Sequence, residues 1–402
     1  MQNCIGSSPR RSVKWLLTIQ DCYCRLTHEG TPMTLSSNTT FVVNRENLHE
    51  HSVLEQDPIQ PGELAEGEVL LAIDRFSFTA NNITYAALGD AFHYWDFFPV
   101  EKPWGQIPVW GFADVAASRH PDVTEGTRIY GYLPMARQLR VQPGRVSKSG
   151  FTDIAAHRQD LPGIYNQYVF TANDPAYRPE HEAFQMLLRP LLVTSFLLDD
   201  FLARQTFFEA EQVILTSASS KTALGLAFML NHQRETRGGP RVLTALTSPG
   251  HAGFVRRLGY YDRVVPYDEL ETLDADQASV SVDFAGNGQV LGRLHEHFAD
   301  QLQFSSLVGA SHWDQRGGGK GLPGPKPELF FAPKYWEQAA GEYGTAALMQ
   351  RFAGLWAPLV ASMEGWMTIR DVRGAEAVAQ AYEDTLEGRI NPDQGLTLTL
   401  AP

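Results

Sequence analysis

The chain has 402 residues, of which 46 are acidic and 33 are basic, so its formal net charge is −13 with neutral histidines. A protein that binds the phosphate backbone of nucleic acids needs a basic surface, which this excess of acidic residues does not supply on average. With 43% hydrophobic and 20% charged residues, the composition excludes disordered, collagen-like and coiled-coil chains. No apolar run reaches the roughly 20 residues of a membrane-spanning helix, so we predict a soluble protein of two or three domains.

The cysteines lie within the first 24 residues, as Cys4, Cys22 and Cys24. The remainder has no thiol for a disulfide bond or a thiolate zinc site, which favours a cytoplasmic protein. Arg10 and Arg11, followed by a short apolar stretch, resemble a twin-arginine export signal, but the stretch ends by residue 20 and is too short for that purpose. The alternative is that residues 1–32 form an N-terminal extension, with disorder as one option, ahead of a folded part.

The first part of the folded chain has the pattern of short β-strands. Extended segments are expected at residues 40–53, 67–78, 107–118 and 126–133, with Gly and Pro between them. This pattern is typical of a small barrel or sandwich, which we place within residues 33–185. Residues 137–176 are polar and lack periodicity, so we predict loops there.

Helices and strands alternate from residue 184 onward. A helix is expected over 184–208, and alternating strands and helices are expected at 212–216, 221–231, 241–246, 252–258, 263–266, 279–284, 289–298 and 303–308. This alternation predicts a doubly wound parallel sheet covered on both faces, over residues 186–340. A ligand of such a sheet binds at the carboxyl ends of its strands.

The last part of the chain, residues 341–402, is expected to hold a helix from residue 343, a helix over 375–386 and a strand over 396–400. A segment rich in Gly and Pro at 316–327 is predicted to be a loop, with a lid over a site as the alternative. The sequence has no internal repeat and no low-complexity tract.

A serine-rich turn joins the first strand of the parallel sheet to its helix. It contains Ser217, Ser219, Ser220, Lys221 and Thr222. Small side chains let the backbone approach a pyrophosphate, whose charge the start of a helix stabilises, although the fingerprint glycines are missing before Gly225. Two alternatives stay open. One is the phosphate loop of a nucleoside triphosphatase, in which Asp283 would bind the metal ion. The other is a helix cap without a ligand.

Further segments support the first interpretation by their order along the chain. They lie at residues 61–73, 78–85, 244–248, 254–267, 282–286, 306–309 and 375–400. In this order they resemble the medium-chain dehydrogenase/reductase superfamily, in its zinc-independent quinone-oxidoreductase and enoyl-reductase branches. The resemblance covers the chain from about residue 53 except for 137–176.

The resemblance implies a fold and an assembly. A GroES-like β-barrel catalytic domain, residues 33–185, would be joined to a Rossmann-type dinucleotide-binding domain, residues 186–340, and residues 341–402 would return to the catalytic domain. It also implies a homodimer and a reaction without zinc, since the body of the chain lacks the thiolates of the zinc-dependent branch. Four residues would lie at the dinucleotide by the same resemblance, namely Thr194, Tyr267, Ala285 and Gly309.

The end of the second strand bears on the choice of cofactor. An NAD site usually places a carboxylate there, and this chain has Thr247 and Ser248 instead, which favours NADPH. Both hydroxyls can donate to a 2′-phosphate, and Lys221 can add positive charge from the neighbouring turn. Arg256 or Arg257 is a further candidate, with a solvated helix face as the alternative.

Candidate catalytic residues lie on the turn after the first long strand. Tyr85 can polarise or protonate a substrate carbonyl, and Asn82 can orient the substrate or the ribose. The alternatives are a buried aromatic ring for Tyr85 and turn hydrogen bonds for Asn82. An aromatic cluster at residues 92–98, with Trp104 and Trp110, predicts a pocket for an apolar substrate, and core packing is its alternative.

Together these features predict a zinc-independent, NADPH-dependent reductase that transfers hydride to a carbonyl-activated alkene or a quinone. Its substrate would be a small apolar or aromatic carbonyl compound, with no nucleic-acid, membrane or metal partner. The alternatives are a ketone or alcohol oxidoreductase and a redox-silent NADPH-binding or sensing protein.

Overall fold

The computed structural model describes residues 37–284, 286–308 and 321–402, and it confirms the parallel sheet expected in the second half of the chain. Its strands are β11 (Gln212–Leu215), β12 (Val242–Thr247), β13 (Arg263–Pro266), β14 (Ser279–Asp283), β15 (Leu302–Leu307) and β16 (Glu328–Leu329). They lie in the order β13-β12-β11-β14-β15-β16, and all neighbours are parallel. Counted from β11 this is the order 3-2-1-4-5-6 of a Rossmann fold.

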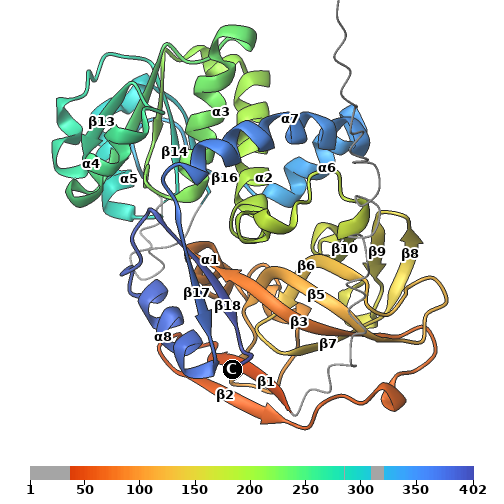
Figure 1. The fold of residues 1–402 in the computed structure, drawn as a ribbon. Helices are drawn as coiled ribbons and strands as arrows, with labels where there is room; N and C mark the ends of the chain where they lie inside the picture. Colours follow the sequence, from red (N-terminus) through yellow and green to blue (C-terminus); the bar gives the residue numbers. More distant parts are fainter. Residues whose placement is uncertain (1–36, 285, 309–320) are drawn as a thin grey trace, which may run out of the picture. The chain divides into compact units, whose positions relative to one another are not determined.

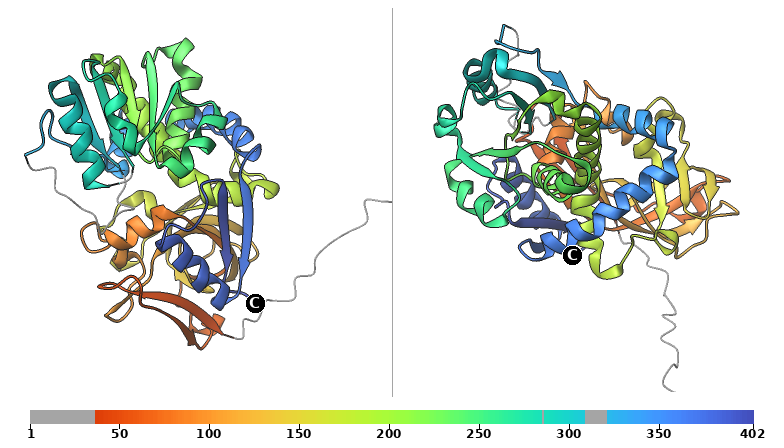
Figure 2. Two further views of the ribbon diagram at one scale, coloured as in Figure 1. Left: turned by 90° about the vertical axis from the view of Figure 1, so that its left-hand side faces the viewer. Right: turned by 90° about the horizontal axis from the view of Figure 1, so that it is seen from above.

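Helices cover both faces of this sheet (Figures 1 and 2). They are α2 (Glu182–Arg204), α3 (Lys221–Arg237), α4 (Pro249–Leu258), α5 (Gly288–Phe298), α6 (Ala332–Tyr343) and α7 (Thr345–Glu364). Val213 and Leu215 of β11 pack in one core with residues of α2, α3 and α7, whereas Ile214 packs with α5 and the turn η8 (Tyr267–Thr272). Because successive side chains of a strand point to opposite faces, burial on both sides accounts for the uninterrupted apolar run of β11.

The first half of the chain and its last segment form two further sheets, in which all paired strands are antiparallel except β17 and β18. A three-stranded sheet has the order β2-β1-β4, and a nine-stranded sheet runs β17-β18-β3-β5-β6-β10-β9-β8, with β7 paired to β3. The strands are β1 (Asn38–Asn44), β2 (His51–Gln56), β3 (Val69–Phe78), β4 (Trp104–Gly105), β5 (Pro108–Ser118), β6 (Arg128–Pro134), β17 (Thr368–Arg373) and β18 (Gln394–Thr399). The mixed fold class, with a Rossmann-type sheet and a GroES-like β-domain, is thereby confirmed.

The prediction of loops over residues 137–176 is wrong. This segment holds four strands, namely β7 (Gln138–Val141), β8 (Pro143–Ser147), β9 (Gly150–Asp153) and β10 (Gln167–Phe170). Each has only four or five residues, too few for polar alternation to be recognised, yet Phe151, Tyr168 and Phe170 are buried in the core of the β-domain. Gly150 is essential to the pairing, since a Cβ there would lie 1.9 Å from the carbonyl oxygen of Tyr168.

The last segment of the chain joins the antiparallel sheet. Leu396 of β18 pairs with Phe78 of β3, and β17 runs parallel to β18. Between them, α8 (Ala375–Leu386) packs on the same core, where the hydroxyl of Tyr382 donates to the carbonyl oxygen of Leu48 at 2.6 Å. β3, in the first part of the described chain, and β17 and β18, at its end, therefore belong to one sheet.

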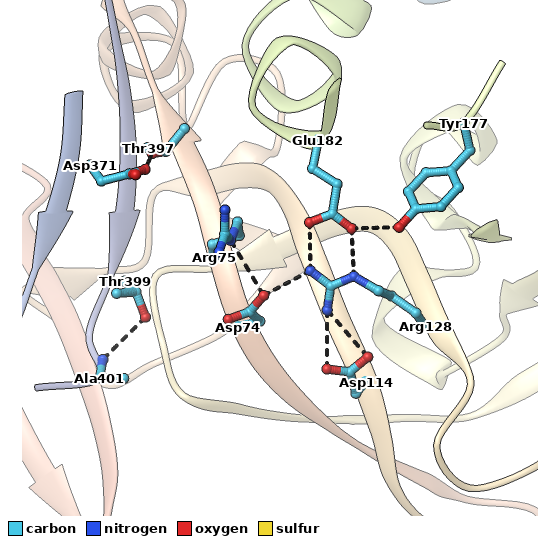
Figure 3. A network of polar contacts seen from close by, with 10 residues as sticks. All are labelled: Asp74, Arg75, Asp114, Arg128, Tyr177, Glu182, Asp371, Thr397, Thr399 and Ala401. Carbon is cyan, nitrogen blue, oxygen red and sulfur yellow. Dashed lines mark hydrogen bonds and ion pairs between the residues drawn. The ribbon is translucent and has the colours of Figure 1, made fainter. Parts of the chain in front are cut away.

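A half-buried arginine ties the start of α2 to the β-domain (Figure 3). Arg128 of β6 donates from Nε to Glu182 at 2.6 Å and from Nη2 to Asp74 at 2.7 Å, and its Nη1 donates to Asp114 at 3.1 Å. The hydroxyl of Tyr177 donates to the same Glu182 at 2.8 Å.

Among the described residues, no helix combines the length and the apolar composition that crossing a bilayer requires.

Candidate functional site

The turn after β11 has the backbone conformation of a dinucleotide turn without its glycine. Ser217 has a φ of +46°, in the left-handed region that glycine adopts most easily. Its N–H donates to the hydroxyl of Tyr267 at 2.9 Å, and the N–H of Ala218 donates to the carbonyl of Leu246 at 3.1 Å. These two bonds hold the conformation that a serine does not favour by itself.

The start of α3 presents unpaired backbone donors. Ser220 is the N-cap residue, and its hydroxyl accepts from the N–H of Ala223 at 3.3 Å. The N–H groups of Ser219, Lys221 and Thr222 have no acceptor among the residues that the structure describes. The capping alternative therefore accounts for Ser220 alone, and the other three donors, at the positive end of a 17-residue helix, can receive an anion.

Gly225 allows α3 to lie close against α2. A Cβ at Gly225 would lie 2.4 Å from Cδ2 of Leu192 and 2.8 Å from Oγ of Ser195. The same Ser195 hydroxyl donates to the carbonyl of Thr222 at 2.8 Å, and Thr194 donates within α2 to Pro190 at 3.3 Å. Gly225 thus permits the close packing of α3 against α2.

Lys221 contacts the C-terminal segment, and its expected role at a 2′-phosphate stays a prediction. Its Nζ donates to the carbonyl of Gln394 at 2.6 Å and lies 3.5 Å from that of Pro392. Burial lowers the pKa of Lys221 to about 8, against the opposing charge of Asp393. The ammonium group therefore joins α3 to the start of β18.

Hydroxyl and imidazole groups surround the end of β12. Thr247 is buried there, and Ser248 is the N-cap residue of α4 but makes no side-chain cap bond. Nδ1 of His251 lies 3.0 Å from Oγ of Ser219, so the start of α4 contacts the serine-rich turn. The predicted arginines lie elsewhere. Arg256 donates to the carbonyl of Val264 at 3.2 Å, and Arg257 lines a cavity of about 360 Å³ with Ser362 and Trp366.

Asp283, at the end of β14, is engaged by the protein itself. It accepts from the hydroxyl of Thr216 and, at 3.1 Å, from the N–H of Gly286, while the N–H of Phe284 donates to Thr216 at 3.2 Å. These bonds tie the ends of β11 and β14 together, and they disfavour the metal-binding role of the triphosphatase alternative. The predicted residues Ala285 and Gly309 lie outside the described part of the chain.

Asn82 and Tyr85 lie on α1 (Ala80–Ala87), the turn expected to carry catalysis. The side chain of Asn82 accepts from the N–H of Thr79 at 2.8 Å and donates to the carbonyl of Pro108 at 2.9 Å. It completes a capping box and is 3% exposed, so these contacts are those of the turn alternative. Its role toward substrate or ribose stays a prediction, and it is not part of the proposal below.

Tyr85 lies in a cluster of buried aromatic rings. Its ring centroid lies 4.6 Å from that of Tyr94, 5.8 Å from that of Tyr132 and 6.3 Å from that of Tyr165. Burial raises the pKa of Tyr85, and polar contacts with Trp110 and other side chains only partly oppose this. The phenol is therefore a neutral hydrogen-bond donor at neutral pH.

The buried hydroxyl of Tyr132 lacks a partner among the described residues of this cluster, whereas the indole of Trp110 is in polar contact with Tyr85. The residues of the predicted aromatic cluster lie in different parts of the structure. Tyr94, Phe97 and Phe98 belong to the cluster, whereas Trp95 packs in the sheet core and Trp104 is in β4. Phe92 stacks on Phe331, at the start of α6, with centroids 5.0 Å apart, so rings of the β-domain meet the parallel-sheet half of the chain.

Sequence reasoning missed several of these residues. Tyr165 lies in the segment predicted to be loops, and its only signal was a tyrosine among polar residues. His251 precedes a predicted helix, without a motif or a second histidine at helical spacing. Its proximity to Ser219 follows from the pairing of β11 with β12, which brings the two turns together.

The fold matches solved structures. CurA from Vibrio vulnificus in complex with NADPH matches at 14% identity with a TM-score of 0.57, over 90% of this chain and 99% of that one. The yhdH oxidoreductase from Salmonella enterica in complex with NADP matches at 11% identity and a TM-score of 0.51. A putative NADPH:quinone reductase from Bacillus thuringiensis matches at 12% identity with a TM-score of 0.50. The matches to the Salmonella and Bacillus proteins each cover 90% of this chain and 99% of the matched chain. At these identities the likeness establishes the fold, which is the one that the resemblance implied.

No curated protein sequence matches the chain. The profile of the family described as "Protein of unknown function (DUF2855)" matches residues 76–391, and the chain belongs to this family.

Proposed function

We propose that the chain is an NADPH-dependent oxidoreductase that reduces a carbonyl-activated alkene or a quinone. The observation that carries the proposal is the turn between β11 and α3, where left-handed Ser217 and three unpaired N–H groups form a cradle for a pyrophosphate. The end of β12 carries hydroxyls and no carboxylate, which suits NADPH better than NADH. When bound, the nicotinamide would supply a hydride.

Residues of this chain would position the hydride acceptor and hold the proton that its oxygen receives. Tyr85, kept neutral by burial, would donate a hydrogen bond to the acceptor oxygen, where negative charge develops. Trp110 offers a second donor in the same cluster. The surrounding rings would exclude water, which strengthens both interactions. A small planar aromatic or apolar carbonyl compound is the class of substrate that such a cluster suits.

A redox-silent dinucleotide-binding protein is the second candidate. It is favoured by the packing of the Tyr85 cluster, in which this ring is only 6% exposed, and by the use of Asn82 in the capping box. Binding of NADPH without turnover of enones, enoyl esters and quinones would support this candidate over the reductase.

A titration of the purified protein with NADPH, NADH and ATP tests the binding half of the proposal. Nucleotide fluorescence gives the affinities, and the thermal shift reports binding to the native state. We expect binding of NADPH in preference to ATP, followed by acceptor-dependent oxidation of NADPH. Selective binding of ATP would instead support the triphosphatase interpretation, and no binding to any nucleotide would leave the turn as a helix cap.

A further inference from the structure

We propose that His251 determines the preference for NADPH over NADH by binding the 2′-phosphate together with Ser219 and Ser248. This inference rests on the proposed function, because it places a ligand at the end of β12.

The position of His251 follows from the pairing of two strands. β12 lies parallel and next to β11, and the N–H of Ala218 donates to the carbonyl of Leu246, so both strands end at one level. His251 is the third residue of α4, and its Nδ1 lies 3.0 Å from Oγ of Ser219. A dinucleotide on a Rossmann sheet places its adenosine ribose at the end of this second strand. The imidazole therefore stands where the 2′-substituent of the ribose would lie.

Two of the other cations near this position are already engaged, since Lys221 donates to Gln394 and Arg256 donates to Val264. Arg257 lines the separate cavity. Nε2 of His251 has no partner among the described residues, and the hydroxyl of Ser248 makes no cap bond. A phosphate would thus meet one imidazole N–H and two serine hydroxyls.

The remaining titratable groups around His251 do not compete for the phosphate. Tyr261 donates its hydroxyl to the carbonyl of Ala218 at 3.0 Å, and Tyr267 binds the N–H of Ser217. Burial raises the pKa of both phenols, that of Tyr267 to about 12, so both are neutral. Asp268 and Glu269, on the turn η8 that follows β13, are exposed to solvent.

The test measures dissociation constants of NADPH and NADH, with adenosine 2′,5′-bisphosphate and AMP as probes without nicotinamide. Wild type is compared with His251→Gln, which removes the imidazole, and with His251→Lys, which places an ammonium group at the same position. Melting temperatures confirm that both variants are folded.

We expect His251→Gln to bind NADPH and adenosine 2′,5′-bisphosphate about tenfold more weakly than wild type, with unchanged affinity for NADH and AMP. His251→Lys should keep the preference for NADPH. The inference is overturned if wild type binds NADPH and His251→Gln keeps the same selectivity. If wild type binds no dinucleotide, the proposed function fails as well, so the two failures are distinguishable.

Discussion

Replacing Gly225 with alanine would place a methyl group in the contact between α2 and α3. The new Cβ would lie 2.4 Å from Cδ2 of Leu192 and 2.8 Å from Oγ of Ser195, both closer than carbon atoms approach one another without displacement. Leu192 is fully buried, so it has no free space to move into. Overpacking of this kind costs about 1–3 kcal/mol, and displacement of Ser195 would weaken its bond to Thr222 by about 1 kcal/mol.

The same substitution also has a favourable contribution. Alanine in the interior of a helix is more stable than glycine by about 1 kcal/mol, so the net destabilisation should be about 1–3 kcal/mol. Gly354, in the interior of α7, is a matched control because nothing lies within 4 Å of its Cβ position and it is exposed. Gly354→Ala should stabilise the protein by about 0.5–1 kcal/mol.

Urea denaturation of wild type and both variants measures the two effects under the same conditions. The expected result is a lower midpoint for Gly225→Ala and a higher one for Gly354→Ala. If Gly225→Ala were as stable as wild type, the close approach of α2 and α3 would not be needed at this position. The packing role assigned to Gly225 would then be refuted.

Three further predictions concern the site. Lys221→Ala should weaken the binding of NADPH and NADH by the same factor, because Nζ contacts Gln394 and not the end of β12. A selective loss of affinity for NADPH in titrations would refute this. Tyr85→Phe should lower turnover about 100-fold or more with unchanged dissociation constants, and unchanged steady-state turnover would exclude the phenol from the mechanism. The folded-state pKa of Lys221, about 8, lies below its pKa in the unfolded chain. Between pH 8 and 10 the unfolded chain therefore binds more protons at Lys221 than the folded protein does, so the free energy of unfolding should rise over this range. Lys221→Met should abolish this rise in urea titrations at the two pH values.

Much of the fold follows from the sequence because burial leaves a clear pattern. β11 is buried on both faces and appears as an apolar run, and the greater lengths of α3 and α5 distinguish these helices from the strands. The strands from β7 to β10 leave no such pattern, since they are short. Their apolar residues become meaningful only when they are paired.

The site was predictable in position and only partly in detail. The topology places a ligand at the end of β11, and the serine-rich turn lies there. The left-handed Ser217 was not predictable, because serine rarely adopts this conformation and a hydrogen bond from its N–H to the hydroxyl of Tyr267, 50 positions later, stabilises it. Lys221 was assigned by its charge alone, and the carbonyl of Gln394, which it binds, belongs to a distant strand.

The link between Lys221 and Gln394 sets an order of events during synthesis. The two residues are 173 positions apart, so at about 5–20 residues per second the ribosome adds the second roughly 10 to 35 s after the first. Until then Lys221 stays in water, and β3, which pairs with β18, has an open edge at Phe76 and Phe78. The nucleotide turn and this edge are completed by the same late strand, so a nascent chain that stops short of β18 exposes both to chaperones or to aggregation.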